Sequence, residues 1–157
     1  MKNLWAPWRE KFVAGKKEKG CIFCKRLKEK KDQKNFILYR GKSAFVILNL
    51  YPYNSGHLMV VAKRHKAQLE NLTPAESLEM MQLSQTWVKN LKKALKPEGI
   101  NLGINLKQAA GAGIHEHVHI HLVPRWKGDT NFMPVLAQTK VISVGLKSVY
   151  KKLKAIA

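Results

Sequence analysis

The chain has 157 residues, of which 45% are hydrophobic, and this is the length and composition of one globular domain with a core of its own. No run of about 18 apolar residues occurs, and no apolar segment precedes a small-residue cleavage site, so we expect a cytoplasmic protein with no membrane span. The formal net charge of +19 attracts polyanions, but the lysines are not interleaved with aromatic residues, so nucleic acid is not the expected partner.

A Cys-x-x-Cys pair, Cys21 and Cys24, is the first feature along the chain. Two cysteines are too few for a secreted disulfide scaffold, and a pair at this spacing is either half of a metal site or a redox dithiol. A short helix is expected at residues 24–33. The β-rich segments 36–39 and 44–48 flank a glycine-containing turn, and they predict a β-hairpin.

The clearest helix signal begins at Thr73. Threonine is a good N-cap, proline follows at the first helical position, and Glu76 stands at the third. Apolar residues then repeat at helical spacing and predict a stripe buried against a sheet: Met80, Leu83, Trp87, Val88, Leu91 and Leu95. Pro97 and Gly99 are expected to end the helix.

Further strands are predicted at residues 57–62, 100–106 and 116–123, and a terminal helix at 146–156. The segment 126–138 is expected to be irregular. Because the connections between strands are short, antiparallel pairing is favoured, with the helices gathered on one face of the sheet. The predicted fold class is therefore α+β.

Four of the six histidines lie within residues 115–121, at every second position. On a β-strand, successive side chains face opposite sides, so the valine, isoleucine and leucine that alternate with the histidines would bury under the helix. The histidines would then line the other face. Packing alone does not explain a row of imidazoles in a chain with so few histidines, and the row predicts a functional site.

Two interpretations of the row remain open from the residues alone. All the histidines could bind one metal ion, or one imidazole could act as a nucleophile that its neighbours position. The turn Gly111-Ala112-Gly113 lies just upstream. Glycine lets main-chain amides approach an anion closely, so this turn favours phosphate chemistry.

The run His117-Val118-His119-Ile120-His121-Leu122-Val123 resembles the motif of the histidine triad (HIT) family at every position, and Pro124-Arg125 follows as is common in that family. The segment 48–61 resembles the family's second signature, in which one stretch ends at Asn49 and the next begins at Gly56-His57. The resemblance covers residues 20–126.

The resemblance divides the chain into an N-terminal arm (1–19), a HIT domain (20–126) and a C-terminal extension (127–157) that ends in a helix. Segments 4–9 and 125–132, together with the glycine-rich turn, resemble one branch of the family. That branch contains diadenosine tetraphosphate phosphorylases and related hydrolases.

The family resemblance implies a fold and a mechanism. Relatives form homodimers in which two five-stranded antiparallel sheets join into one. His119 would attack the α-phosphorus of a nucleotide and form a covalent nucleotidyl-histidine, which suits an imidazole that is neutral near pH 7. His121 and His57 would hold phosphate oxygens or orient His119. No organic cofactor is implied.

The same resemblance implies the residues that bind the nucleotide. Asn49 matches an asparagine that contacts the ribose, and amides at Gly111 and Gly113 would stabilise charge on the phosphate together with His121. One departure matters here. Many relatives carry Gln-Ser or Gln-Thr shortly before the triad, where this chain has Gly113-Ile114, so the acid for the leaving group is unassigned. The extra histidine, His115, is expected at the surface.

Several relatives hold a structural zinc ion, and their ligand positions correspond to Cys21, Cys24, His65 and His117. Two sulfurs and two nitrogens make a suitable tetrahedral zinc shell. A closed shell of this kind does not activate water. If zinc is bound, His117 cannot also serve as the leaving-group acid, so the three histidines of the motif would divide their tasks.

The expected activity is therefore cleavage of a dinucleoside polyphosphate, such as diadenosine tetraphosphate, with phosphate or water as the acceptor. A purine nucleoside phosphoramidase, which breaks a P–N bond with the same residues, is the alternative enzyme. A non-catalytic nucleotide-binding or nucleic-acid-associated protein is the alternative of another class. Pure binding needs no nucleophile, so an intact His119 argues against that alternative.

Overall fold

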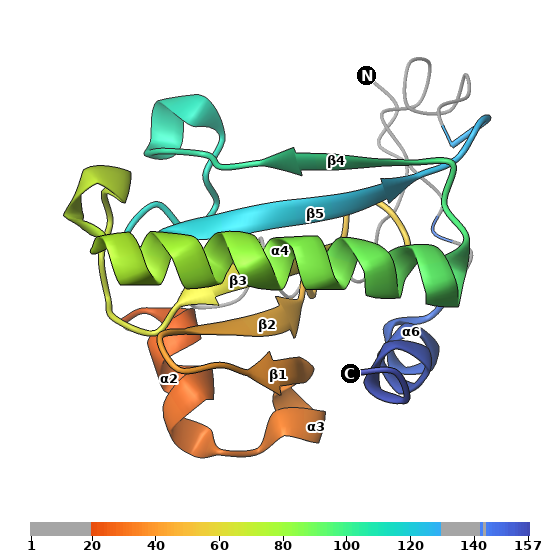
Figure 1. Ribbon diagram of the computed structural model, residues 1–157, viewed down its shortest axis with the longest axis horizontal. Helices are drawn as coiled ribbons and strands as arrows, with labels where there is room; N and C mark the ends of the chain where they lie inside the picture. The colour runs from red at the N-terminus through yellow and green to blue at the C-terminus, as the bar shows by residue number, and fades with distance from the viewer. Residues whose placement is uncertain (1–19, 130–141, 143) are drawn as a thin grey trace, which may run out of the picture.

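A five-stranded antiparallel sheet with the strand order β1-β2-β3-β5-β4 forms the centre of the computed structural model, which describes residues 20–129, 142 and 144–157 (Figure 1). The strands are β1 (Ile37–Arg40), β2 (Ala44–Leu48), β3 (Leu58–Ala62), β4 (Gly99–Gly103) and β5 (His119–Arg125). The predicted α+β class with an antiparallel sheet is confirmed. The expected N-terminal arm, and most of the segment expected to be irregular, lie outside the described residues.

Four α-helices accompany the sheet in the described part of the chain: α2 (Ile22–Glu29), α3 (Asp32–Asn35), α4 (Pro74–Leu95) and α6 (Leu146–Lys154). Short 3-10 turns, η1 (Leu69–Asn71) and η2 (Gln108–Ala110), lie in the connections. The single helix predicted at 24–33 is divided into α2 and α3, because Lys30 adopts a left-handed conformation with φ of 51°. None of the described helices is long and apolar enough to cross a membrane.

The start of α4 has the predicted geometry. The Thr73 side chain accepts a hydrogen bond from the Glu76 main-chain N–H, and the Glu76 carboxylate accepts one from the Thr73 N–H at 2.8 Å. This capping box satisfies two amides that the helix itself leaves unpaired. At the other end, Lys96 takes a left-handed conformation immediately before Pro97, so the helix ends where the sequence predicts.

The main core lies between the sheet and the two helices α4 and α6. Met80, Trp87 and Leu91 on α4 are almost fully buried against the sheet, while Leu83, Val88 and Leu95 pack at the margin, so the predicted stripe is confirmed. A smaller apolar cluster occupies the opposite face, where α2 rather than α4 covers the sheet: Phe23, Ile37, Phe45, Ile47, Met59 and Val61. The sequence had placed the helices on one face, and α2 differs from that expectation.

Strand β5 begins later than predicted, at His119 rather than at residue 116, and it extends to Arg125. The residue before it is held by another loop, since the Val118 N–H donates to the Lys66 carbonyl at 2.7 Å. Consequently His117 stands just outside the strand and is not part of one continuous row with His119 and His121.

Candidate active site and metal centre

His119 opens strand β5 and pairs with Val61 of β3. Its side chain is 3% exposed, and Nδ1 lies 2.7 Å from the main-chain carbonyl oxygen of His117. A carbonyl only accepts, so Nδ1 carries the proton and donates this hydrogen bond. The other ring nitrogen, Nε2, therefore keeps an unshared electron pair, which is what a nucleophile requires.

The surroundings of His119 keep its ring neutral. Burial lowers the pKa of His119, and the hydrogen bond to the His117 carbonyl opposes this effect in part. The His121 ring lies edge-on at 4.6 Å between centroids, and the Phe23 ring lies at 5.1 Å. Two rings thus contact the imidazole while its Nδ1 is bonded, so its orientation is set from several directions.

A chain of hydrogen bonds runs from the main chain through His57 to His121. The Tyr53 N–H donates to His57 Nδ1 at 3.0 Å, so the proton of His57 is on Nε2. His57 Nε2 in turn lies 2.9 Å from His121 Nδ1 and donates to it. By the same reasoning, His121 carries its own proton on Nε2, where it can be donated to a phosphate oxygen.

Both members of this pair are neutral near pH 7. Burial, with the neighbouring His121 and His119 imidazoles, lowers the pKa of His57 to about 3. Burial and the nearby His119 lower the pKa of His121 to about 4. His57 is completely buried and bonds His121, so its position suits orienting that residue rather than touching a ligand.

The loop between β2 and β3 carries His57 and Asn49. The Asn49 side chain accepts a hydrogen bond from the Tyr51 N–H at 2.9 Å, and its amide nitrogen lies 3.3 Å from His57 Nδ1. Asn49 therefore shapes the turn, and the ribose contact implied for it stays a prediction. Gly56 has a φ of +79°, and a Cβ there would collide with Leu95, so glycine is required directly before His57.

The glycine-rich loop leads from η2 towards β5. Gly111 has a φ of +84°, and its N–H already donates to the Gln108 carbonyl at 2.9 Å. The N–H of Gly113 has no hydrogen-bond partner within the described residues. Of the two glycines that the sequence proposed for phosphate binding, Gly113 is thus the one whose amide is available.

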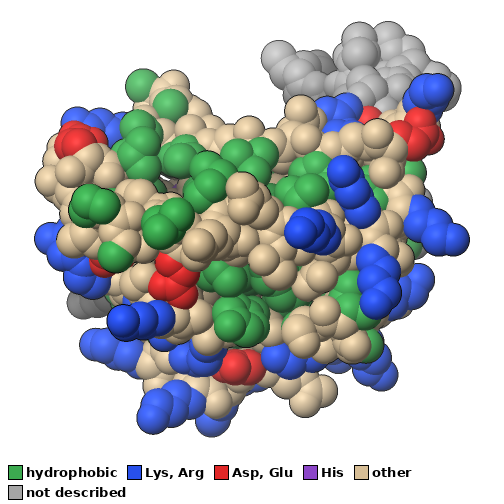
Figure 2. Space-filling model, in the orientation of Figure 1, with side chains coloured by type: hydrophobic (Ala, Val, Ile, Leu, Met, Phe, Trp, Pro, Cys, Tyr) green, Lys and Arg blue, Asp and Glu red, His purple; other side chains and the backbone are tan. Residues whose placement is uncertain are grey.

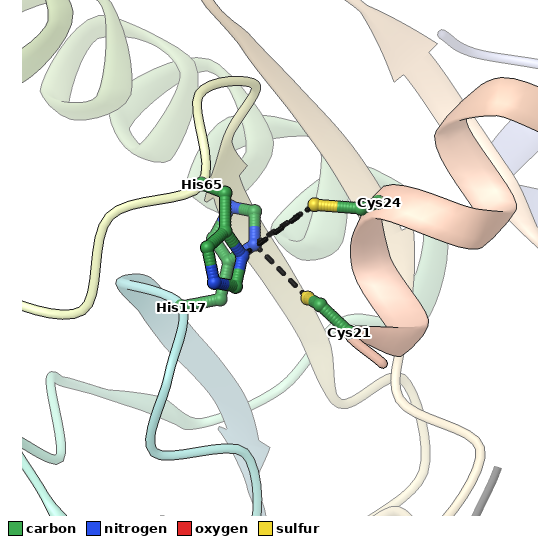
Figure 3. Close-up of side chains that lie close together, drawn as sticks. All are labelled: Cys21, Cys24, His65 and His117. Carbon is green, nitrogen blue, oxygen red and sulfur yellow. Dashed lines mark hydrogen bonds between the residues drawn. The ribbon is translucent and has the colours of Figure 1, made fainter. Parts of the chain in front are cut away.

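The four predicted metal ligands lie together, although they come from three separate segments (Figure 3). Their ligand atoms are all within 4.8 Å of one another: Cys21, Cys24, His65 and His117. The Cys21 sulfur is 3.2 Å from His117 Nδ1, and the Cys24 sulfur is 3.5 Å from His65 Nδ1. In a tetrahedral zinc site, the zinc–sulfur bond is about 2.3 Å long and the zinc–nitrogen bond about 2.0 Å. A sulfur ligand and a nitrogen ligand of one zinc ion are therefore about 3.5 Å apart.

His117 also has the support that a zinc-binding histidine usually has. Its Nε2 donates to the Ala62 carbonyl at 2.7 Å, which leaves Nδ1 free to face the cysteines. Burial lowers the pKa of His117, so the ring is neutral, as a ligand must be. Without a cation, burial and the neighbouring Cys21 raise the pKa of the Cys24 thiol. The donor set and the spacing fit a closed tetrahedral zinc site.

A hollow of about 310 Å³ opens beside His121, and it is lined by Tyr53, Asn101, Leu102, Gly103, Asn105, His121, Val123 and Arg125. Sequence reasoning predicted His121 but missed the part of the lining on β4, which is Asn101, Leu102 and Gly103. The pairing of β4 with β5 is the signal that could have found these residues, because it places Gly103 opposite His121 and Asn101 opposite Val123. The Arg125 guanidinium is held at the rim by Asp129 at 2.6 Å.

Comparisons with known proteins agree with this geometry. A family model described as "HIT domain" matches residues 30–128. The AP-4-A phosphorylase of Mycobacterium tuberculosis is 38% identical over 150 residues, which cover 90% of this chain and 77% of that protein. The asymmetrical bis(5'-nucleosyl)-tetraphosphatase of Schizosaccharomyces pombe is 31% identical over 93 residues, or 59% of this chain and 50% of that protein.

Among solved structures, the Zn-bound histidine triad family protein from Mycobacterium smegmatis superposes with a TM-score of 0.71 at 25% identity. The match covers 87% of this chain and 91% of that one.

Proposed function

The chain belongs to the HIT domain family, and from this premise we propose that it is an enzyme that cleaves dinucleoside polyphosphates such as diadenosine tetraphosphate, through a nucleotide bound covalently to His119. One observation carries the mechanism: His119 Nδ1 donates to the His117 carbonyl, so Nε2 is the free nucleophilic nitrogen. The substrate class is supported by the similarity to AP-4-A phosphorylase over 90% of the chain.

In the first step, His119 Nε2 forms a bond to the α-phosphorus, and the bond from that phosphorus to the bridging oxygen breaks. With diadenosine tetraphosphate, AMP stays on His119 and ATP leaves. His121 donates its Nε2 proton in a hydrogen bond to a phosphate oxygen, and the Gly113 amide offers a second donor. Both donors are in place before the reaction, so they need little rearrangement as charge develops.

In the second step, an acceptor oxygen attacks the phosphorus and the N–P bond breaks, which frees His119. Inorganic phosphate as acceptor gives ADP, and water gives AMP. The similarity to the phosphorylase favours phosphate. We assign the departing polyphosphate, and then the acceptor, to the hollow beside His121, because Asn101 and Asn105 place amide groups there and the Arg125 guanidinium, which is paired with Asp129, lies in its lining.

Two further features belong to this proposal. A zinc ion held by Cys21, Cys24, His65 and His117 would be structural, because four protein ligands leave no open position for water.

A homodimer would cover the apolar side chains exposed on α4 and β4, Leu78, Met81 and Leu102. Figure 2 shows hydrophobic side chains gathered across α4 and above it, while Lys and Arg lie around the lower and right-hand parts of this face.

Product analysis tests the proposal. The protein is incubated with diadenosine tetraphosphate in the presence and absence of inorganic phosphate, with His119→Ala as the inactive control. ADP and ATP that depend on phosphate would show phosphorolysis, and AMP and ATP would show hydrolysis. The proposal fails if His119→Ala retains full turnover. It fails also if the protein leaves the dinucleotide intact and cleaves only a nucleoside phosphoramidate.

A further inference from the structure

Phe23 links the metal centre to the nucleophile. It stands between Cys21 and Cys24 in the sequence, on the first turn of α2, and its side chain is 2% exposed. The phenyl ring lies 5.1 Å from the His119 ring and 5.5 Å from the His117 ring, measured between centroids. One buried side chain thus contacts both the proposed nucleophile and a candidate metal ligand.

Phe23 packs in the apolar cluster under the sheet, but helix α2 has no capping interaction of its own that fixes its first turn. The helix has eight residues, its N-cap Cys21 makes no capping hydrogen bond, and its first turn has no acidic residue. A helix this short is marginal by itself. Its C-terminal half is tied down, since Arg40 donates to the Leu27 carbonyl at 3.0 Å. Its start is held by the two cysteines, which face His65 and His117 (Figure 3).

We propose that Phe23 is a positioning residue for His119, and that the metal centre acts on the reaction by holding the Phe23 ring against the nucleophile. The inference rests on the proposed nucleotidyl transfer. The His117 carbonyl holds the Nδ1 end of the imidazole, and Phe23 limits the rotation that this single hydrogen bond leaves open. Nε2 then keeps the one direction that in-line attack on phosphorus needs. The metal itself touches no substrate.

The first test compares two identical substitutions in the same apolar cluster. Phe23→Leu removes the ring that contacts His119. Phe45→Leu is the matched control: Phe45 is fully buried and packs against Phe23 at 6.4 Å, but among the ring contacts of the described residues it does not reach His119. Both variants lose comparable packing. Only Phe23→Leu is expected to slow formation of the nucleotidyl-enzyme in a single turnover, by about tenfold, with KM changed less.

The second test asks whether the metal acts through Phe23. The wild-type protein and Phe23→Leu are each stripped of metal with a chelator, and zinc chloride is then added back. Removing the metal should slow the wild type by a factor similar to that of Phe23→Leu, and should slow the variant little further, since coupled changes do not add. Equal losses in both proteins would overturn the proposal, because the metal would then act by another route.

A readout independent of turnover separates this inference from the proposed function. The ring ¹⁵N resonances of His119, assigned with His119→Ala, are recorded at one fixed pH. We expect a single protonated Nδ1 in the wild type and in Phe45→Leu, and exchange-broadened signals in Phe23→Leu and in metal-free protein. If no nucleotidyl-enzyme forms but the resonances behave in this way, the proposed function fails and the positioning role stands. Unchanged resonances, or equal effects of both leucine variants, would overturn the positioning role.

Discussion

His119 is tied through Nδ1 to the main-chain carbonyl of His117, at 2.7 Å, while the side chain of His117 faces Cys21 and Cys24. One residue therefore serves two sites by different groups: its carbonyl fixes the tautomer of the proposed nucleophile, and its imidazole contributes to the metal centre. Because the carbonyl belongs to the main chain, no side-chain substitution at His117 removes that hydrogen bond acceptor directly.

Replacing His57 by alanine should lower kcat by about tenfold and change KM less, because His121 loses the partner that fixes its tautomer. The substrate would still bind, but the hydrogen-bond donor on His121 Nε2 would be present only part of the time. Steady-state kinetics with diadenosine tetraphosphate measure this effect. His115→Ala is the control, since His115 is an exposed histidine whose ring lies 3.9 Å from the neighbouring Glu116 carboxylate. A loss confined to KM would contradict the orienting role of His57.

Stability should fall as the pH is lowered below 6.5. The folded-state pKa of His57 is about 3 and that of His121 about 4, while both titrate near 6.5 when unfolded. Between these values the unfolded chain binds more protons, so acid favours unfolding. Each buried imidazole contributes a slope of up to about 1.4 kcal/mol per pH unit.

Urea unfolding at pH 7, 6 and 5 measures this slope. Among the described residues, the groups facing His57 are His121, His119, Asn49 and the amide and ring of Tyr53, and none of them carries an opposite charge that would reverse the sign. His57→Asn should flatten the dependence, and His115→Ala should leave it unchanged. A free energy of unfolding that is constant from pH 7 to 5 would contradict the neutral, buried state of these imidazoles.

Much of the fold was predictable because local signals were strong. The Thr73–Glu76 capping box defines the start of α4, and the continuous apolar run of segment 44–48, which is buried at every position, defines β2. The break between α2 and α3 was not predictable, because Lys30 is an ordinary helix former and takes its left-handed conformation from the surrounding tertiary structure. The late start of β5 has a similar cause, since the Lys66 loop engages Val118.

The candidate site, like the fold, was predictable from the sequence only in part. The two-residue spacing predicted that His119 and His121 lie on one strand face. The family resemblance predicted that Cys21 and His65 belong to one metal-binding cluster, and the structure places them together. What sequence reasoning missed are contacts that depend on main-chain paths. The direction of the His57 relay follows from the Tyr53 amide. The place of Phe23 beside His119 follows from the packing of α2 on the sheet.

The purified protein should contain about one zinc ion per chain. His65→Ala should reduce that content strongly, because three ligands on a half-exposed site bind zinc less tightly than four. Elemental analysis after dialysis against a chelator provides the measurement. His115→Ala, which alters a histidine outside the cluster, should retain the metal. Equal zinc contents in the two variants would remove His65 from the ligand set.

Gly111 and Gly113 should respond differently to alanine. At Gly111 the φ of +84° strains any L side chain, so Gly111→Ala should destabilise the protein by about 1–2 kcal/mol although nothing lies within 4 Å of the added Cβ. Gly113 has neither a positive φ nor a neighbour within 4 Å, so Gly113→Ala should change the free energy of unfolding little. Chemical denaturation of both variants measures the difference, and equal losses would show that the loop geometry is not as described.

Trapping the covalent intermediate tests the central claim most directly. The protein is mixed with diadenosine tetraphosphate without inorganic phosphate, quenched within one turnover at alkaline pH, digested and examined by mass spectrometry. We expect one AMP group on His119, located by fragmentation of the peptide that also carries His117 and His121, and no adduct in His119→Ala. An AMP group on His117 or His121 would contradict the assignment of the nucleophile. Full turnover by His119→Ala would contradict the covalent mechanism itself.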